Sequence, residues 1–184
     1  SLRSHAETLL SLAEQSIRHG LDQGEPLAVE PADYPTELVE PRATFVTLTE
    51  RGQLRGCIGS LEAVRALVAD VAHNAYAAAF EDPRFPPVTR EEVAQLDLKV
   101  EVLTPAEPLP FTDEADLIDR LQPGEDGLVL EGPGGRRATF LPTVWESLPD
   151  PEQFLAHLKQ KAGLPPDFPA ERLTVQRYTT EVLD

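Results

Sequence analysis

The sequence predicts an α+β fold in which a mainly antiparallel sheet packs against helices. The first observation is a hairpin pattern, because alternating β-branched residues at 43–49 and a second strand at 54–58 flank a short turn at 50–53. The second is that helical segments and proline-rich links alternate irregularly with strands, without the glycine punctuation of a dinucleotide-binding βαβ unit.

Composition limits the class of protein. The chain has 184 residues, of which 41% are apolar, so it is long enough for one sizeable core or one core with a satellite. Its 32 acidic and 16 basic side chains give a net charge of −16, which argues against non-specific binding to nucleic acid or to an anionic membrane. One cysteine, no signal-peptide pattern and no long apolar run predict a soluble cytoplasmic protein.

The first half of the chain contains two predicted helices around the hairpin. Residues 4–19 predict a helix, because their apolar residues lie on one stripe. The first residues have the spacing of a capping box, and Gly20 follows where a C-cap is expected. Residues 21–41 contain four prolines and predict an extended surface connection. A second helix is expected from about Glu62 to Phe80, with Val64 on its apolar stripe.

The second half contains shorter elements. Thr89 and Glu92 predict another capping box, and residues 96–102 alternate apolar and polar residues as a half-buried strand does. The remaining expected elements are a short helix at 113–121, a hairpin at 127–131 and 136–141, a helix from Asp150 to Gly163 and a last strand at 172–183. We interpret residues 1–184 as a single domain, with a smaller lobe at roughly 105–145.

Several chemistries have no support in the sequence. There is no phosphate loop and no Gly-x-Ser-x-Gly nucleophile elbow. The four histidines lie far apart and lack the spacing of zinc or iron ligands, so we expect no metal and no cofactor.

Cys57 is the one strong nucleophile. The nearby Arg55 would favour its thiolate, and His73 with Asp70 would complete a Cys-His-acid arrangement. The alternative, which we favour, is a small buried cysteine without reactivity, because His73 falls opposite the apolar stripe of its helix.

Arg55 and Arg84 are candidates for binding a carboxylate or phosphate. The alternative for each is a salt bridge, for instance to Asp82 or Glu101. Gly56 and Gly59 weaken their strand, which is typical of a bulge or of a close approach to bare backbone.

Blocks along nearly the whole chain, from about Leu9 to Tyr178, resemble the AMMECR-type domain family. They occur in the family's order: Leu54-Arg55-Gly56-Cys57-Ile58-Gly59, Asn74-Ala75, Asp82-Pro83-Arg84-Phe85, Asp126-Gly127-Leu128-Val129-Leu130, Thr139-Phe140-Leu141-Pro142, and the segment from Phe154 to Leu164. The resemblance implies one α+β domain of two unequal lobes, with a cleft between them beside Arg55-Gly56-Cys57. It also implies partners in the AmmeMemoRadiSam system, namely a Memo-type protein and a radical S-adenosylmethionine protein, but no settled reaction.

Three functions follow as hypotheses. The first is an accessory protein whose cleft, lined by Arg55, Gly56, Gly59 and Arg84, binds a small anionic ligand or a partner. The second is an enzyme that uses Cys57 as a nucleophile or redox group. The third is a non-catalytic scaffold, in which the Leu54–Gly59 segment serves only for packing.

Overall fold

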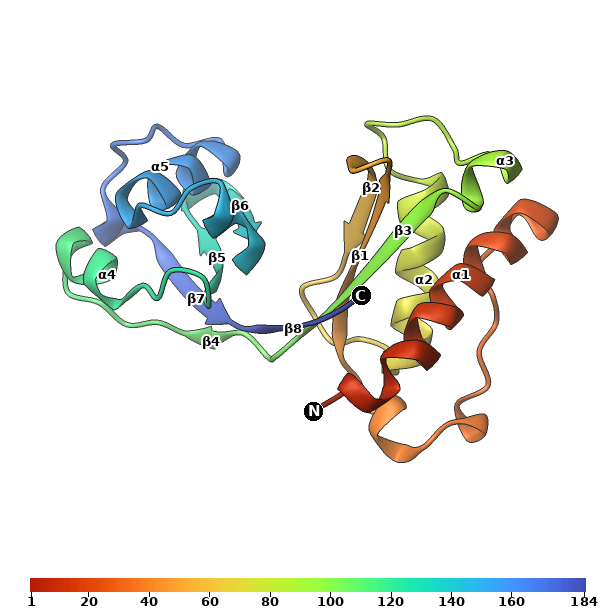
Figure 1. Ribbon diagram of the computed structural model, residues 1–184. Helices are drawn as coiled ribbons and strands as arrows, with labels where there is room; N and C mark the ends of the chain where they lie inside the picture. Colours follow the sequence, from red (N-terminus) through yellow and green to blue (C-terminus); the bar gives the residue numbers. More distant parts are fainter. The chain divides into compact units, whose positions relative to one another are not determined.

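The computed structural model describes residues 1–184 and confirms the α+β class, with helices packed on largely antiparallel sheets (Figure 1). The chain divides into two compact units. The first comprises Ser1–Pro105 together with Glu181–Asp184, and the second comprises Ala106–Thr180. None of the helices is long and apolar enough to cross a membrane.

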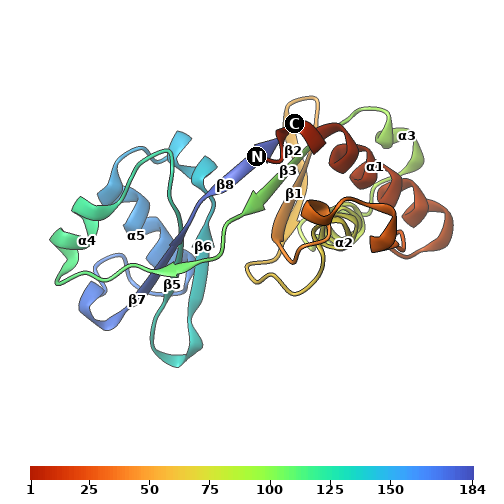
Figure 2. The ribbon, with the colours of Figure 1, turned by 90° about the horizontal axis from the view of Figure 1, so that it is seen from below.

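The sheet of the first unit has the strand order β2-β1-β3-β8. Its strands are β1 (Ala43–Glu50), β2 (Gln53–Gly59), β3 (Leu96–Leu103) and β8 (Thr180–Leu183). Helices α1 (Ala6–Gln23) and α2 (Leu67–Phe80) cover one face of this sheet in both views (Figures 1 and 2). Buried side chains of both helices and of the sheet, among them Ile17, Val71 and Val46, form the core between these layers.

The end of α1 and the start of α2 differ from the prediction. Helix α1 continues through Gly20, which lies against Tyr76 and Phe80, and it ends at Gly24 in a left-handed conformation. A glycine inside the helix thus marks a close contact with α2 and not a C-cap. Helix α2 begins only at Leu67, and Val64 lies 67% exposed in the preceding loop.

The capping box predicted at the start of the first helix is not formed, because the N-cap of α1 is His5 and makes no side-chain capping hydrogen bond. Two other predicted helix starts are confirmed. Thr89 and Glu92 form a capping box at the short helix α3 (Arg90–Val93). In the second unit the Asp150 side chain accepts a hydrogen bond from the Glu152 N–H at the start of α5 (Pro151–Lys161).

The sheet of the second unit has the strand order β4-β7-β5-β6. The strands are β4 (Glu107–Pro108), β5 (Gly127–Glu131), β6 (Arg137–Phe140) and β7 (Thr174–Tyr178), and α4 (Glu114–Arg120) is the second helix of this unit. Its core contains Trp145 stacked on Phe154, with ring centroids 3.8 Å apart. The single last strand predicted at 172–183 is in fact two strands, because β7 pairs in this sheet and β8 belongs to the other.

Candidate functional site

Strand β2 contains a bulge at Arg55. Leu48 lies opposite Gly56, and Thr49 lies opposite Leu54, so Arg55 is the extra residue between these two pairs. The bulge interrupts the simple alternation expected for this strand. As a result the charged Arg55 is only 9% exposed, whereas the apolar Leu54 is 43% exposed.

Gly56 and Gly59 provide room for packing. A Cβ on Gly56 would overlap the carbonyl oxygen of Ala78 in α2, so only a bare backbone lets this helix lie so close to the strand. A Cβ on Gly59 would overlap the ring of Phe45, its cross-strand partner. The close approach that the sequence suggested therefore involves the protein's own helix and ring.

Arg55 is committed to an internal ion pair. Its Nε donates to Glu92 Oε2 at 2.8 Å and its Nη2 to Glu92 Oε1 at 3.1 Å. The hydrogen bonds from Arg55 lower the pKa of Glu92 to about 2. The salt bridge considered as the alternative for Arg55 thus exists, but its partner is Glu92 of α3, which sequence reasoning did not identify.

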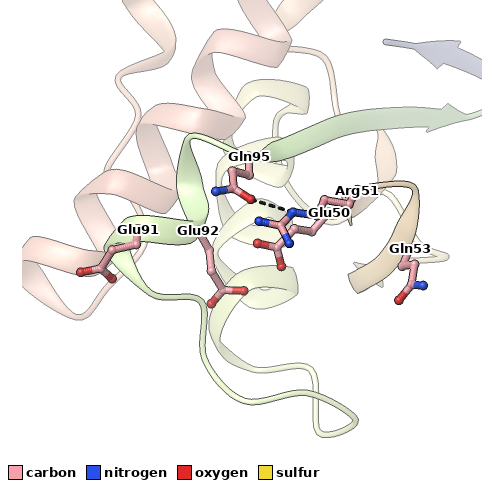
Figure 3. A pocket seen from close by; sticks show the side chains of 6 residues that line it. All are labelled: Glu50, Arg51, Gln53, Glu91, Glu92 and Gln95. Carbon is pink, nitrogen blue, oxygen red and sulfur yellow. Dashed lines mark hydrogen bonds between the residues drawn. The ribbon is translucent and has the colours of Figure 1, made fainter.

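A cavity of about 470 Å³ adjoins this ion pair at the β1–β2 turn. Figure 3 shows Arg51 directed toward Gln95, with an Nε to Oε1 distance of 3.1 Å, and Glu50 beside it. The lining residues are Glu50, Arg51, Gln53, Glu91, Glu92 and Gln95. The lining contains three carboxylates and one guanidinium, and of the carboxylates Glu92 is paired with Arg55, so the net negative charge of the cavity disfavours an anionic ligand.

Asp82 and Arg84 lie against the outer edge of β2 beside Cys57. The buried Asp82 carboxylate accepts hydrogen bonds from the Cys57 N–H at 3.0 Å and from the Arg84 Nη2 at 2.7 Å. The Arg84 Nε and backbone N–H also donate to it, each at 3.0 Å. These bonds, chiefly those from the Arg84 side chain, hold the pKa of Asp82 well below its usual range.

Arg84 differs from Arg55 in its exposure, since 55% of its side chain is accessible. Its Nε and Nη2 face Asp82, and Nη2 also lies 3.5 Å from the Cys57 carbonyl oxygen. The Nη1 donors remain for a ligand. Asp82 therefore fixes the orientation of a guanidinium that stays open to solvent.

Cys57 is half-buried, and its Sγ lies 3.3 Å from Thr47 Oγ1. Burial raises the pKa of its thiol, which opposes the lowering by Thr47, Arg84 and Lys99. The surroundings therefore favour the neutral thiol and not the thiolate that a nucleophile requires.

The acid of the hypothetical Cys-His-acid arrangement is engaged elsewhere. Asp70 is fully buried, and it accepts hydrogen bonds from Thr44 Oγ1 at 2.7 Å and from Arg65 Nη1 at 2.8 Å. Asn74 Nδ2 donates to Asp70 at 3.1 Å, and the Ser60 hydroxyl lies 3.4 Å away. His73, on the same helix, is exposed, so Asp70 anchors the loop before α2 and does not orient an imidazole.

Cys57, Thr47 and Lys99 form a row across three strands. Thr47 pairs with Cys57 on one side and with Lys99 on the other. Their neighbours Val46, Leu48 and Val100 belong to the core under the helices, so alternation places the row on the opposite face of the sheet. We call Thr47, Cys57 and Lys99, with Arg84 at the strand edge, the Cys57 face.

Two cations flank the thiol on this face, Arg84 at the edge and Lys99 two strands away. Both act on the Cys57 thiol electrostatically. Lys99 Nζ also lies 3.6 Å from Glu101 Oε1. The alternation of β1 and β3 was visible in the sequence, but only the register shows that Thr47 and Lys99 lie beside Cys57.

The comparisons with known proteins agree with this architecture. The AMMECR1 family model matches residues 10–183. A protein from Methanothermobacter thermautotrophicus is 39% identical over 186 residues, which cover 98% of this chain and 94% of the relative. A protein from Thermococcus gammatolerans is 39% identical over 189 residues, covering 97% and 89% respectively. The crystal structure of an uncharacterized protein from Pyrococcus horikoshii is similar with a TM-score of 0.88 and 37% identity, covering 98% of this chain and 91% of that one. On these grounds the chain belongs to the AMMECR1 family.

Proposed function

We propose that this protein is a binding protein whose Cys57 face takes a small anionic ligand, a carboxylate or a phosphate. The observation that carries the proposal is the pair of cations, Arg84 and Lys99, on either side of a neutral thiol in a chain of net charge −16. Electrostatic repulsion would keep anions from most of such a surface. Arg84 is paired with Asp82 and Lys99 with Glu101, but both carboxylates are buried, whereas the two cations are 55% and 31% exposed and so present the positive ends of these pairs to a ligand.

The geometry supports contact with one ligand through both cations. Successive strands lie about 5 Å apart, so Cys57 and Lys99 are separated by about 10 Å between their Cα atoms. Long side chains at both ends can reach inward over this span. Arg84 Nη1, Lys99 Nζ and the Thr47 hydroxyl supply donors, and anions accept hydrogen bonds from all three groups.

The structure supports catalysis by the Cys57 thiol less well than it supports ligand binding. A nucleophilic or redox cysteine needs a lowered pKa, and burial raises that of Cys57. The hypothetical base, His73, is exposed and is not oriented by Asp70, because Asp70 is bonded to Thr44, Arg65 and Asn74.

The family resemblance extends the proposal to partners. We propose that the protein works in a cytoplasmic pathway with a Memo-type protein and a radical S-adenosylmethionine protein. Co-purification of the three co-expressed proteins tests this part, and their complete separation at physiological salt would contradict it.

The ligand proposal is tested by titrating the protein with inorganic phosphate and with succinate, followed by NMR chemical shifts. We expect saturable shifts at β1–β3, weakened about tenfold by Lys99→Gln or Arg84→Lys, the loss typical of a charged hydrogen bond. Arg90→Gln is the matched control, because Arg90 lies on the surface and pairs with Asp22.

Cys57→Ser separates binding from thiol catalysis. Binding should survive this change, because the cations are intact. Absence of shifts with either anion, or equal binding by the Lys99 and control variants, would contradict the proposal.

A further inference from the structure

The loop that follows α2 places an aromatic ring beside two arginines. Phe85 is half-buried, and its backbone N–H donates to the Asp82 carbonyl oxygen in a tight turn. The guanidinium carbon of Arg84 lies 5.4 Å from the centroid of the Phe85 ring, and that of Arg55 lies 6.0 Å from it. Both distances are within the range of cation–π attraction. One ring thus joins an exposed guanidinium to a buried one.

Phe85 completes the surroundings of the Arg84 guanidinium. Asp82 accepts hydrogen bonds from Nε and Nη2 of Arg84, and so fixes one edge of this planar group. A plane held by one edge can still tilt about that edge, and a ring beneath the guanidinium opposes this tilt. The two contacts together fix the direction of the Nη1 donors. A side chain that is ordered before a ligand arrives loses less conformational entropy on binding.

Arg55 needs the same ring for a different reason. Its Nε and Nη2 donate to Glu92, but its Nη1 is buried and has no hydrogen-bond partner. Burying such a donor is costly, and the negative face of an aromatic ring attracts the guanidinium where an acceptor is missing. Because Arg55 is only 9% exposed, a ligand has little access to it. Its influence on the Cys57 face therefore passes through Phe85.

We propose that Phe85 is a positioning residue of the anion site, that its ring holds Arg84 for the ligand, and that Arg55 supports the site through this ring. The inference rests on the function proposed above, because it concerns an anion bound at the Cys57 face. The contacts run from Glu92 to Arg55, from Arg55 to Phe85 and from Phe85 to Arg84. A buried ion pair then contributes to ligand affinity without touching the ligand.

Inorganic phosphate is the probe, and its affinity for the full chain is measured by NMR titration. Phe85→Leu removes the ring but keeps a large apolar side chain, and it should weaken phosphate binding about three- to tenfold, because Arg84 must then be ordered by the ligand. Phe85→Tyr keeps the ring and should bind within about twofold of the parent protein. Phe168→Leu is the matched control, because it removes a similar contact, with Arg172 at 5.0 Å, from the second unit.

A double-mutant cycle tests the contribution of Arg55. Arg55→Gln should weaken phosphate binding about two- to fivefold, the size of one cation–π contact. In a Phe85→Leu background the same change should cause no further loss, because the ring through which Arg55 acts is already absent. The Arg84 Nε–H signal, identified by its absence in Arg84→Lys, gives a readout without ligand. It should shift in Phe85→Leu, which lacks the ring current, and stay in place in Phe168→Leu.

The parent protein separates this inference from the proposed function. If it shows no shifts with phosphate, the proposed function fails and the inference fails with it. If it binds phosphate and Phe85→Leu binds equally well, only the inference is overturned. A loss in Phe85→Tyr as large as that in Phe85→Leu also overturns it, since the ring is then not the group required. If Phe85→Leu does not fold in urea titrations, Arg55→Gln decides, and unchanged phosphate binding by that variant overturns the inference.

Discussion

The two units bury charge in different ways. In the first unit, Asp70 of α2 is fully buried with hydrogen bonds to four residues and does not line the cavity described above. In the second unit, Lys159 has two acceptors and a cavity of about 480 Å³ beside it. Both charges are paired, but the network of Asp70 is closed, whereas the partner of Lys159, Glu114, is 43% exposed and open to water.

The largest expected effect follows from the closed network. Asp70→Ala removes the shared acceptor of Thr44, Asn74 and Arg65, and leaves buried donors unpaired. We expect a loss of about 3–5 kcal/mol in the free energy of unfolding, measured by urea denaturation.

The matched change in the second unit should cost far less. Lys159→Met leaves Glu114, but that side chain is 43% exposed and water can solvate it, so we expect a change within about 1 kcal/mol. Equal losses for Asp70→Ala and Lys159→Met would remove the contrast between the two sites.

The two units also differ in the space beside a small residue, Gly56 in the first unit and Ala156 in the second. Gly56→Ala places a methyl group against the Ala78 carbonyl oxygen, where backbone must move, and should cost about 1–3 kcal/mol. Ala156→Leu extends into a cavity and should cost less than about 1 kcal/mol. Thermal unfolding of the two variants compares them directly, and a harmless Gly56→Ala would show that α2 can shift away from β2.

The smallest effect concerns pH. Arg55 lowers the pKa of Glu92 from 4.5 to about 2, so this pair stabilises the fold above pH 4.5. That contribution is lost as the pH falls from 4.5 through 2, because the folded state then binds the proton that the unfolded state has already taken up.

Arg55→Gln should therefore reduce the fall in stability over this range, seen in urea unfolding at stepped pH values. Asp70 acts in the opposite direction, since burial raises its pKa. An Arg55→Gln variant with the acid profile of the parent protein would show that the ion pair does not govern this window.

The candidate site could be predicted only in part. Leu54–Gly59 was identified from its glycines and its lone cysteine, and the alternating pattern of residues 96–102 placed Lys99 on a polar face. The partner of Arg55 could not be found, because Glu92 is 37 residues away and reaches it through a bulge that no periodicity reveals. Lys159 was visible only as one member of a family-like segment, since burial of a lysine depends on what packs around it.

The sequence by itself determined the local structure: hydrophobic alternation for the strands, capping residues for α3 and α5, and a hairpin before the motif. Those features depend on neighbours within a few residues, where steric and hydrogen-bonding preferences act directly. The tertiary structure decided the continuation of α1 through Gly20, the commitment of Arg55 to Glu92 and the burial of Lys159. Each depends on side chains that are distant in sequence, because packing and desolvation are fixed only when those segments meet.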